Sequence, residues 1–205
     1  MNLQFLIDSI KESPIINKNG YNYFVHALTD GALPIDPEIL FKTARQLQEL
    51  IERDVTHSNL DYIIAPEAMA LPIATVVSTL MDRPYVVARK RKYGLPGELE
   101  VHQQTGYSES TMYINSIKPG RNVIIIDDVV STGGTISAIV DTLESNHINV
   151  IGSYTIIEKD GAAERLQDQG YNVKSLVNVI MGTNSIETIL VSNKKEINNH
   201  VRTLS

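Results

Sequence analysis

The chain has 205 residues, 42% of them hydrophobic and 20% charged, which is typical of a globular protein built on one large α/β domain. A formal net charge of −6 disfavours a general nucleic-acid-binding surface, and the absence of cysteine excludes disulfides, a thiol nucleophile and a cysteine zinc site. Because the start lacks a signal-peptide pattern and no apolar run approaches the roughly 20 residues that span a bilayer, we expect a cytoplasmic protein that does not contact membranes.

The first quarter of the chain predicts two helices around an extended segment. Apolar residues recur at helical spacing between residues 3 and 10, so a short amphipathic helix is expected before Pro14. Residues 15–25 are expected to be extended, with a turn at Asn19-Gly20. Asp36-Pro37 combines an N-cap with proline at the first helical position, so a second helix should begin there.

From residue 62 onward, short apolar runs alternate with helical patterns. This alternation predicts an α/β fold with a central, mostly parallel sheet flanked by helices on both faces. We expect residues 1–205 to form one domain, with a polar tail over residues 192–205. The expected strands are residues 62–65, 85–88, 112–117, 122–126, 150–157 and 173–180, and the expected helices are 71–80, 135–146 and 162–168.

A long polar stretch, residues 89–108, separates two of these strands. Four basic residues, Arg89 to Lys92, are followed by Gly94, Pro96 and Gly97. Structureless connections of this length are typically lids or binding loops, so a mobile cover over an anion is one interpretation. A solvated, charged β-ribbon at the sheet edge explains the same residues, and both interpretations stay open.

The most informative segment is VIIIDDVVSTGGT, residues 123–135. Its apolar, β-branched start predicts a strand buried on both faces, and a helix should open near its end. Gly133 and Gly134 allow backbone angles closed to other residues and the close approach of a ligand. Successive N–H groups from Ser131 to Thr135 can converge on a phosphate at the positive end of that helix, with three side-chain hydroxyls as further donors.

Two adjacent carboxylates, Asp127 and Asp128, precede this turn. We expect them just outside the carboxyl end of the strand, where open α/β sheets bind ligands. There they can accept hydrogen bonds from two sugar hydroxyls and help to hold magnesium, directly or through water. A turn capped by serine and threonine would explain the glycines and hydroxyls but not the two acids. The motifs G-x-x-x-x-G-K-[ST] and G-x-G-x-x-G are absent, which disfavours a nucleoside-triphosphate loop and a dinucleotide site.

This segment closely resembles the 5-phosphoribosyl-1-pyrophosphate motif of type I phosphoribosyltransferases. The resemblance implies that Asp127 and Asp128 are the catalytic acids that bind the ribose hydroxyls, with Mg2+ as cofactor. It implies a 5′-phosphate loop made of Val130, Ser131, Thr132, Gly133, Gly134 and Thr135. It also implies the fold of that family, with a small hood expected in residues 1–35 and a flexible lid in residues 89–108.

Further segments extend the resemblance over most of the chain and point to purine enzymes. Arg89-Lys90-Arg91 and Leu95-Pro96-Gly97-Glu98 are similar to adenine phosphoribosyltransferases. Three other segments resemble archaeal hypoxanthine/guanine enzymes: Tyr23-Phe24-Val25-His26, Ala65-Pro66-Glu67-Ala68-Met69 and Tyr93-Gly94-Leu95.

The same resemblance implies three further groups of site residues. A pyrophosphate site is implied at Glu67, Ala68, Met69, Arg89, Lys90 and Lys92. The implied lid residues are Gly94, Glu98 and Tyr107. Lys159 is the candidate contact to an exocyclic oxygen of the purine, although an exposed turn would also explain residues 158–161.

Three positions depart from the family patterns. Many hypoxanthine-guanine enzymes carry an aspartate where Ser131 stands, and serine cannot perform its proposed proton transfer at neutral pH. Adenine enzymes use a lid glutamate that Gly106-Tyr107-Ser108 lacks, and they commonly place arginine where Met69 stands. The general acid or base is therefore unassigned, with Asp128, Glu98 and Glu100 as candidates by proximity.

We therefore expect a purine phosphoribosyltransferase of purine salvage, with hypoxanthine or guanine favoured as the base. Adenine and xanthine remain alternatives within this class, and orotate or uracil would make it a different phosphoribosyl enzyme. A non-catalytic purine sensor that regulates transcription is the alternative of another class, although the first 35 residues are short for a winged helix. The family also suggests a homodimer.

Overall fold

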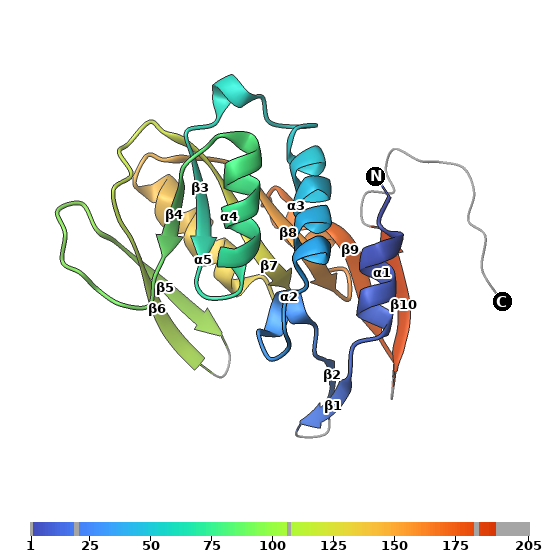
Figure 1. The fold of residues 1–205 in the computed structure, drawn as a ribbon. Coiled ribbons are helices and arrows are strands. Elements are labelled where there is room, and N and C mark those ends of the chain that lie inside the picture. Colours follow the sequence, from blue (N-terminus) through green and yellow to red (C-terminus); the bar gives the residue numbers. More distant parts are fainter. Residues whose placement is uncertain (1, 19–20, 106–107, 183–184, 192–205) are drawn as a thin grey trace.

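The computed structural model describes residues 2–18, 21–105, 108–182 and 185–191 (Figure 1). Over these residues the main sheet has the strand order β10-β9-β8-β7-β3-β4, parallel throughout except for the antiparallel edge strand β10. This arrangement confirms the predicted α/β class. The strands are β3 Tyr62–Pro66, β4 Tyr85–Ala88, β7 Asn122–Val130, β8 Asn149–Lys159, β9 Val173–Met181 and β10 Ile186–Val191.

Helices cover both faces of this sheet (Figure 1). One face packs against α1 (Gln4–Lys11), α3 (Pro37–Ile51) and α4 (Ala70–Met81), and the other against α5 (Gly134–Ser145) and α6 (Ala162–Asp168). The central strand β7 sends Ile124 and Ile126 to the first face, and Val123 and Ile125 to the second. Burial on both faces explains why its sequence is continuously apolar.

The predicted start of α3 is confirmed in atomic detail. Oδ1 of Asp36 accepts hydrogen bonds from the N–H groups of Glu38 at 2.8 Å and Ile39 at 3.0 Å. These two bonds satisfy donors that the first turn of a helix leaves unpaired.

Two small elements follow α1 and lie beside the carboxyl ends of the parallel strands (Figure 1). Residues 15–25 form the predicted extended segment as the antiparallel strands β1 (Ile15–Lys18) and β2 (Tyr21–Phe24), whereas the predicted turn at residues 19–20 lies outside the described residues. The four-residue helix α2 (Ala27–Asp30) was not predicted. Its N-cap, His26, is buried and joins it to α1.

The His26 ring makes one hydrogen bond on each side. Nδ1 accepts from the N–H of Leu28 at 3.3 Å, and Nε2 lies 3.1 Å from Oγ of Ser9 on α1. Burial lowers the pKa of His26, against the opposing effect of Asp30, so the neutral ring is favoured. His26 is thus a structural link between α1 and α2.

The stretch predicted as a lid is only partly a loop. Residues 89–98 are mostly irregular, but β5 (Leu99–Thr105) then pairs with β6 (Ser108–Ile114) as an antiparallel ribbon, so the strand predicted at residues 112–117 begins and ends earlier. Val101, Met112 and Ile114 are buried in the second core cluster, which explains why this polar stretch is ordered as strands. The ribbon joins the end of β4 through two main-chain hydrogen bonds between Arg89 and Tyr113.

Two other elements were missed, the edge strand β10 and the 3-10 turn η1 (His57–Asn59). The remaining predicted helices and strands are confirmed to within a few residues at their ends. No described helix combines the length and apolar character that a membrane crossing requires.

Replacing Gly133 tests how tightly the second face is packed. Gly133 has φ +85°, and an added Cβ would lie 2.6 Å from Cδ2 and 2.9 Å from Cγ of the buried Leu166. We expect Gly133→Ala to lower the free energy of unfolding by about 2–5 kcal/mol, combining backbone strain and overpacking. Gly120→Ala, at φ +80° with no atom within 4 Å, isolates the strain at about 1–2 kcal/mol. If urea denaturation shows that the two variants lose the same free energy of unfolding, the packing argument for Gly133 is contradicted.

Candidate functional site

The two carboxylates of Asp127 and Asp128 lie at the carboxyl end of β7 and are almost fully buried, with exposed fractions of 8% and 7%. They were predicted just outside the strand, and that placement was wrong, because β7 continues to Val130 and Asp127 pairs with Thr155 of β8. The ladder with β3, however, ends at Ile125. The acids therefore lie beyond the end of the ladder with β3 and beside β8.

Burial raises the pKa of both acids. For Asp127, burial acts against the hydrogen bonds it shares with Asp128, including the 2.9 Å bond from the N–H of Asp128 to Oδ1 of Asp127. For Asp128, burial is reinforced by the charges of Asp127 and of Asp30 on α2. The two adjacent carboxylates, with the charge of Asp30 acting on Asp128, favour a bound cation or hydroxyl donors.

The loop after β7 presents a row of unpaired donors. None of the N–H groups of residues 131–135 donates to an acceptor within the described parts of the chain. Gly133 occupies the N-cap of α5 in a left-handed conformation, and no side chain caps this helix. Val130 is buried below the loop, while Ser131 and Thr132 are exposed. The predicted loop, including Gly134 and Thr135 at the start of α5, is therefore open to an anion.

Two residues that the sequence analysis did not single out form hydrogen bonds to this loop from neighbouring elements. Nη2 of Arg165 on α6 donates to the carbonyl oxygen of Ser131 at 3.0 Å. Nε2 of Gln103 on β5 donates to Oγ1 of Thr135 at 3.0 Å, and Oε1 of Gln103 accepts from Oγ of Ser110 at 3.0 Å. Both contacts join residues more than 30 positions apart, so no local pattern could have revealed them.

The residues predicted to bind pyrophosphate follow β3 and β4, which are parallel neighbours. Glu67 accepts a hydrogen bond from the N–H of Lys90 at 2.8 Å, and Nε of Arg89 lies 3.6 Å from its other carboxylate oxygen. The peptide bond between Glu67 and Ala68 is cis. The resemblance implied that Glu67, Arg89 and Lys90 share one site, and the contact of the Glu67 carboxylate with the basic segment brings them together.

The charged lid residues are paired with one another. Nζ of Lys92 contacts Glu100, and this hydrogen bond raises the pKa of Lys92. Burial of Glu98 acts to raise its pKa, but hydrogen bonds from Asn115 and from the N–H groups of Tyr93 and Gly94 outweigh this effect and lower the pKa. Glu98 thus closes the loop around Gly94. Tyr107, the third predicted lid residue, lies outside the described residues.

On the other side of the acids, Lys159 and Met69 contact the segment that follows α1. Nζ of Lys159, at the end of β8, lies 4.9 Å from the ring centre of Phe24 and 5.9 Å from that of Tyr23. The sulfur of Met69 would lie 2.7 Å from a Cβ added to Gly31, so this side chain packs directly on the residue after α2.

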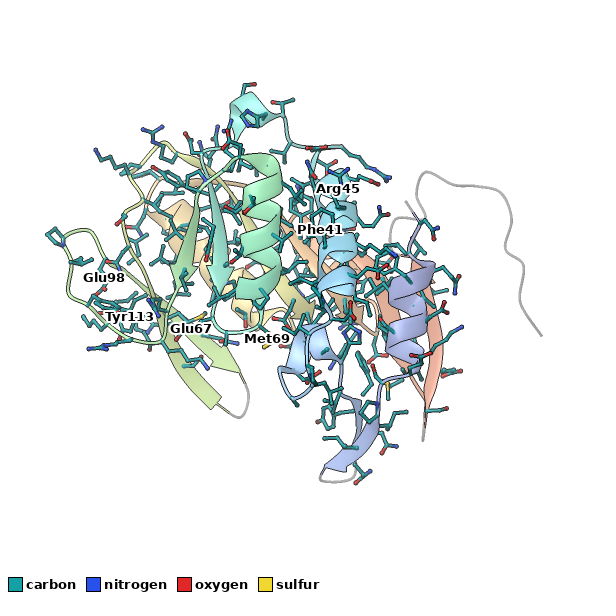
Figure 2. The ribbon with its side chains drawn as sticks, viewed as in Figure 1. Phe41, Arg45, Glu67, Met69, Glu98 and Tyr113 are labelled. Atoms are coloured by element: carbon teal, nitrogen blue, oxygen red, sulfur yellow. The ribbon has the colours of Figure 1, made fainter. Side chains whose placement is uncertain are left out.

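Figure 2 shows Glu98, Tyr113, Glu67 and Met69 in succession along the carboxyl edge of the sheet, from the lid to α2. The predicted acids, phosphate loop, basic segment and Lys159 all belong to this edge, because each follows or ends a parallel strand. This is the edge at which open α/β sheets bind ligands.

Removing one buried acid should stabilise the ligand-free protein. An aspartate in the unfolded chain has a pKa of about 3.9, and folding raises the pKa of Asp128. Between the unfolded pKa and the raised folded pKa, the folded state binds more protons than the unfolded state. The free energy of unfolding therefore falls as pH rises through this range. We expect Asp128→Asn to raise the free energy of unfolding by about 1–3 kcal/mol at pH 8. The gain should fade toward pH 4.

Asp61 provides the matched contrast. The N–H of Asn122 is the main cause that lowers its pKa, with Arg121 as a second partner. Asp61→Asn should therefore destabilise the protein at pH 8, with a loss that disappears as pH falls through the lowered pKa. Thermal denaturation at pH 8, at pH 4 and at a pH below the lowered pKa of Asp61 measures both variants, and destabilisation by Asp128→Asn at pH 8 would contradict the assignment of an uncompensated buried charge.

Comparison with known proteins identifies the same family that the sequence resembles. Residues 31–188 match the model of the phosphoribosyl transferase domain. A hypoxanthine/guanine phosphoribosyltransferase from Ferroglobus placidus is 43% identical over 187 residues, covering 91% of this chain and 97% of its own. HGPRTase-like protein 1 from Natrialba magadii is 44% identical over 174 residues, which cover 85% of this chain and 90% of that protein.

Solved structures agree in fold. An adenine phosphoribosyltransferase from Thermoanaerobacter pseudethanolicus superposes with a TM-score of 0.70 at 24% identity, covering 86% of this chain and 99% of its own. A second, from Rhodothermus marinus, gives a TM-score of 0.68 at 23% identity, over 87% of this chain and all of that one. With a matching family model over most of its length and relatives above 40% identity, this chain belongs to the phosphoribosyl transferase domain family.

Proposed function

We propose that this purine phosphoribosyltransferase transfers the phosphoribosyl group of 5-phosphoribosyl-1-pyrophosphate to hypoxanthine or guanine in purine salvage, giving the nucleoside 5′-monophosphate and pyrophosphate. One observation carries the proposal: two buried acids and a row of unpaired N–H groups follow one another on a single strand-loop-helix unit. Sugar hydroxyls suit the acids and a phosphate suits the N–H groups, and a phosphorylated ribose carries both in one molecule.

In this proposal Asp127 and Asp128 accept hydrogen bonds from the ribose hydroxyls, and residues 130–135 bind the 5′-phosphate. The reaction replaces pyrophosphate at the anomeric carbon by a purine nitrogen. The sugar becomes more positive and the leaving group more negative as the bond breaks. Catalysis therefore depends mainly on positioning and on electrostatic stabilisation.

Magnesium fits the donor set of this site. The raised pKa values of Asp127 and Asp128 reflect buried carboxylates whose ionisation a cation would favour. Over the described residues, no group of three or more histidine, cysteine, aspartate or glutamate side chains could hold a metal ion. Water and substrate oxygens would thus supply the remaining ligands, as Mg2+ commonly requires. Bound there, magnesium neutralises charge on the leaving pyrophosphate.

The pyrophosphate would be held by main-chain groups of Glu67, Ala68 and Met69 and by the charges of Arg89, Lys90 and Lys92. Without ligand, Arg89 faces Glu67 and Lys92 faces Glu100. We propose that pyrophosphate takes the place of these carboxylates as the lid closes and excludes water. Glu98 and Glu100 are occupied within the lid, which leaves Asp128 as the candidate for proton transfer to the purine.

The environment of Lys159 supports an oxo-purine as the base. The Lys159 ammonium lies over the Phe24 ring and near that of Tyr23, so a planar base could share this space with the aromatic rings. An ammonium donates to the exocyclic oxygen of hypoxanthine or guanine, whereas the amino group of adenine offers a second donor at that position. The names of two relatives, both hypoxanthine/guanine phosphoribosyltransferases, agree with this choice of base.

A homodimer is also part of this proposal. The apolar faces of α1 and α3 are buried within the chain itself, with Leu6, Ile10 and Leu47 fully covered, so a dimer contact on these helices would use other side chains. Phe41, labelled on α3 in Figure 2, is 51% exposed and is one candidate.

The double variant Asp127→Asn/Asp128→Asn tests the acids. We expect transfer to fall below about one thousandth of the wild-type rate, because the ribose contacts and the magnesium site are lost together. Circular dichroism should show that the fold survives. Undiminished turnover in this variant would refute the site.

Replacing Lys159 tests base recognition. Wild-type protein incubated with magnesium, 5-phosphoribosyl-1-pyrophosphate and each base should convert hypoxanthine and guanine faster than adenine. Lys159→Gln should raise the KM for hypoxanthine by about tenfold or more, the size of a lost charge-assisted hydrogen bond, and should leave the KM for 5-phosphoribosyl-1-pyrophosphate within twofold. A variant with unchanged base preference would exclude Lys159 from the base site.

A further inference from the structure

The guanidinium of Arg165 contacts two main-chain carbonyls in different loops. Nη2 donates to the oxygen of Ser131 at 3.0 Å, and Nη1 donates to the oxygen of Asp160. Ser131 opens the proposed 5′-phosphate loop, and Asp160 follows Lys159, the proposed base contact. One side chain on α6 thus joins the loops assigned to the two ends of the product nucleotide.

The contact with Ser131 fixes the direction of the next N–H group. The carbonyl of Ser131 and the N–H of Thr132 belong to one planar peptide unit, in which a trans bond points them in opposite directions. Because Arg165 holds the oxygen on the α6 side, the N–H of Thr132 is directed away from α6. The positive charge of Arg165 also polarises this peptide and makes the N–H a stronger donor.

The contact with Asp160 holds a turn that needs support. Asp160 and Gly161 both have left-handed backbone angles, with φ of +53° and +71°, and a left-handed aspartate is unfavourable relative to glycine. The N–H of Gly161 donates to Oδ1 of Asn178 on β9 at 3.1 Å, so the turn is bound on one side by β9 and on the other by Arg165.

The Arg165 charge is available for this task. Within the described parts of the chain, no carboxylate lies within salt-bridge distance of its guanidinium, and the side chain is exposed at the protein surface. The phosphate loop itself contains no basic residue between Val130 and Thr135.

We propose that Arg165 is a positioning residue that holds the 5′-phosphate loop and the base loop in a fixed relation to each other. The inference rests on the proposed roles of residues 131–135 and Lys159. Lysine at position 165 can hold one carbonyl at a time, whereas methionine keeps the length of the side chain and donates to neither.

The test measures three variants of the full-length enzyme. Arg165→Met should raise the KM for 5-phosphoribosyl-1-pyrophosphate and the KM for hypoxanthine by about tenfold each, with kcat within threefold. Arg165→Lys should recover part of both effects. Lys118→Met removes one exposed positive charge near the amino end of β7 and should change neither KM by more than twofold.

Direct binding separates this inference from the proposed site. Ribose 5-phosphate should bind Arg165→Met about tenfold more weakly than wild type, and Thr135→Val should weaken it as well. If Thr135→Val and wild type bind ribose 5-phosphate equally, the phosphate-loop assignment fails. If Thr135→Val weakens binding while Arg165→Met binds like wild type, only the role of Arg165 fails. A fall in kcat with both KM values unchanged would also overturn that role.

Discussion

The burial of two adjacent carboxylates, Asp127 and Asp128, is the constraint on which the rest of this site depends. The cost of burying them is met by the packing of β7, which is covered by helices on both faces and hydrogen-bonded to β3 and β8. The ladder with β3 stops two residues before Asp127, so at the acids it is the pairing with β8 that fixes the backbone. A strand that frayed at this point would let the acids turn to water and lose their alignment with the loop that follows.

The loop and its surroundings follow from the same strand. The chain must reverse direction at the end of β7 to place α5 against the second face, and the left-handed Gly133 makes this turn with the Leu166 side chain packed against it. Among the residues that the structure describes, the turn leaves the first N–H groups of α5 without acceptors and close in sequence to the acids. In the proposed site, the binding of sugar hydroxyls by the acids and of a phosphate by the loop would thus both arise from one change of direction in the backbone.

Much of this arrangement could be predicted from the sequence because its causes are local. The apolar run of β7, the acids and the glycine-containing turn lie within thirteen consecutive residues, and Asp36-Pro37 specifies the start of α3 by itself. The sequence left a lid and a β-ribbon as equal interpretations of residues 89–108, and it could not decide for the ribbon, since the polar residues of β5 and β6 alternate with a buried face that only the packed structure reveals. Arg165 and Gln103 were missed for a similar reason, because their partners are distant in sequence and their side chains are of types that usually lie in solvent.

The cross-strand pairing of β5 and β6 has a consequence for how the active site closes. Seven residue pairs join β5 to β6, and the hydrogen bonds between Arg89 and Tyr113 join this ribbon to the end of β4. A segment already ordered in this way loses little conformational freedom when it folds over a substrate, whereas an unstructured loop of the same length would lose about 1–2 kcal/mol per residue fixed. Because Val101, Met112 and Ile114 also anchor the ribbon in the second core cluster, we expect closure to involve the irregular residues 89–98, so that less binding energy is lost in ordering the segment.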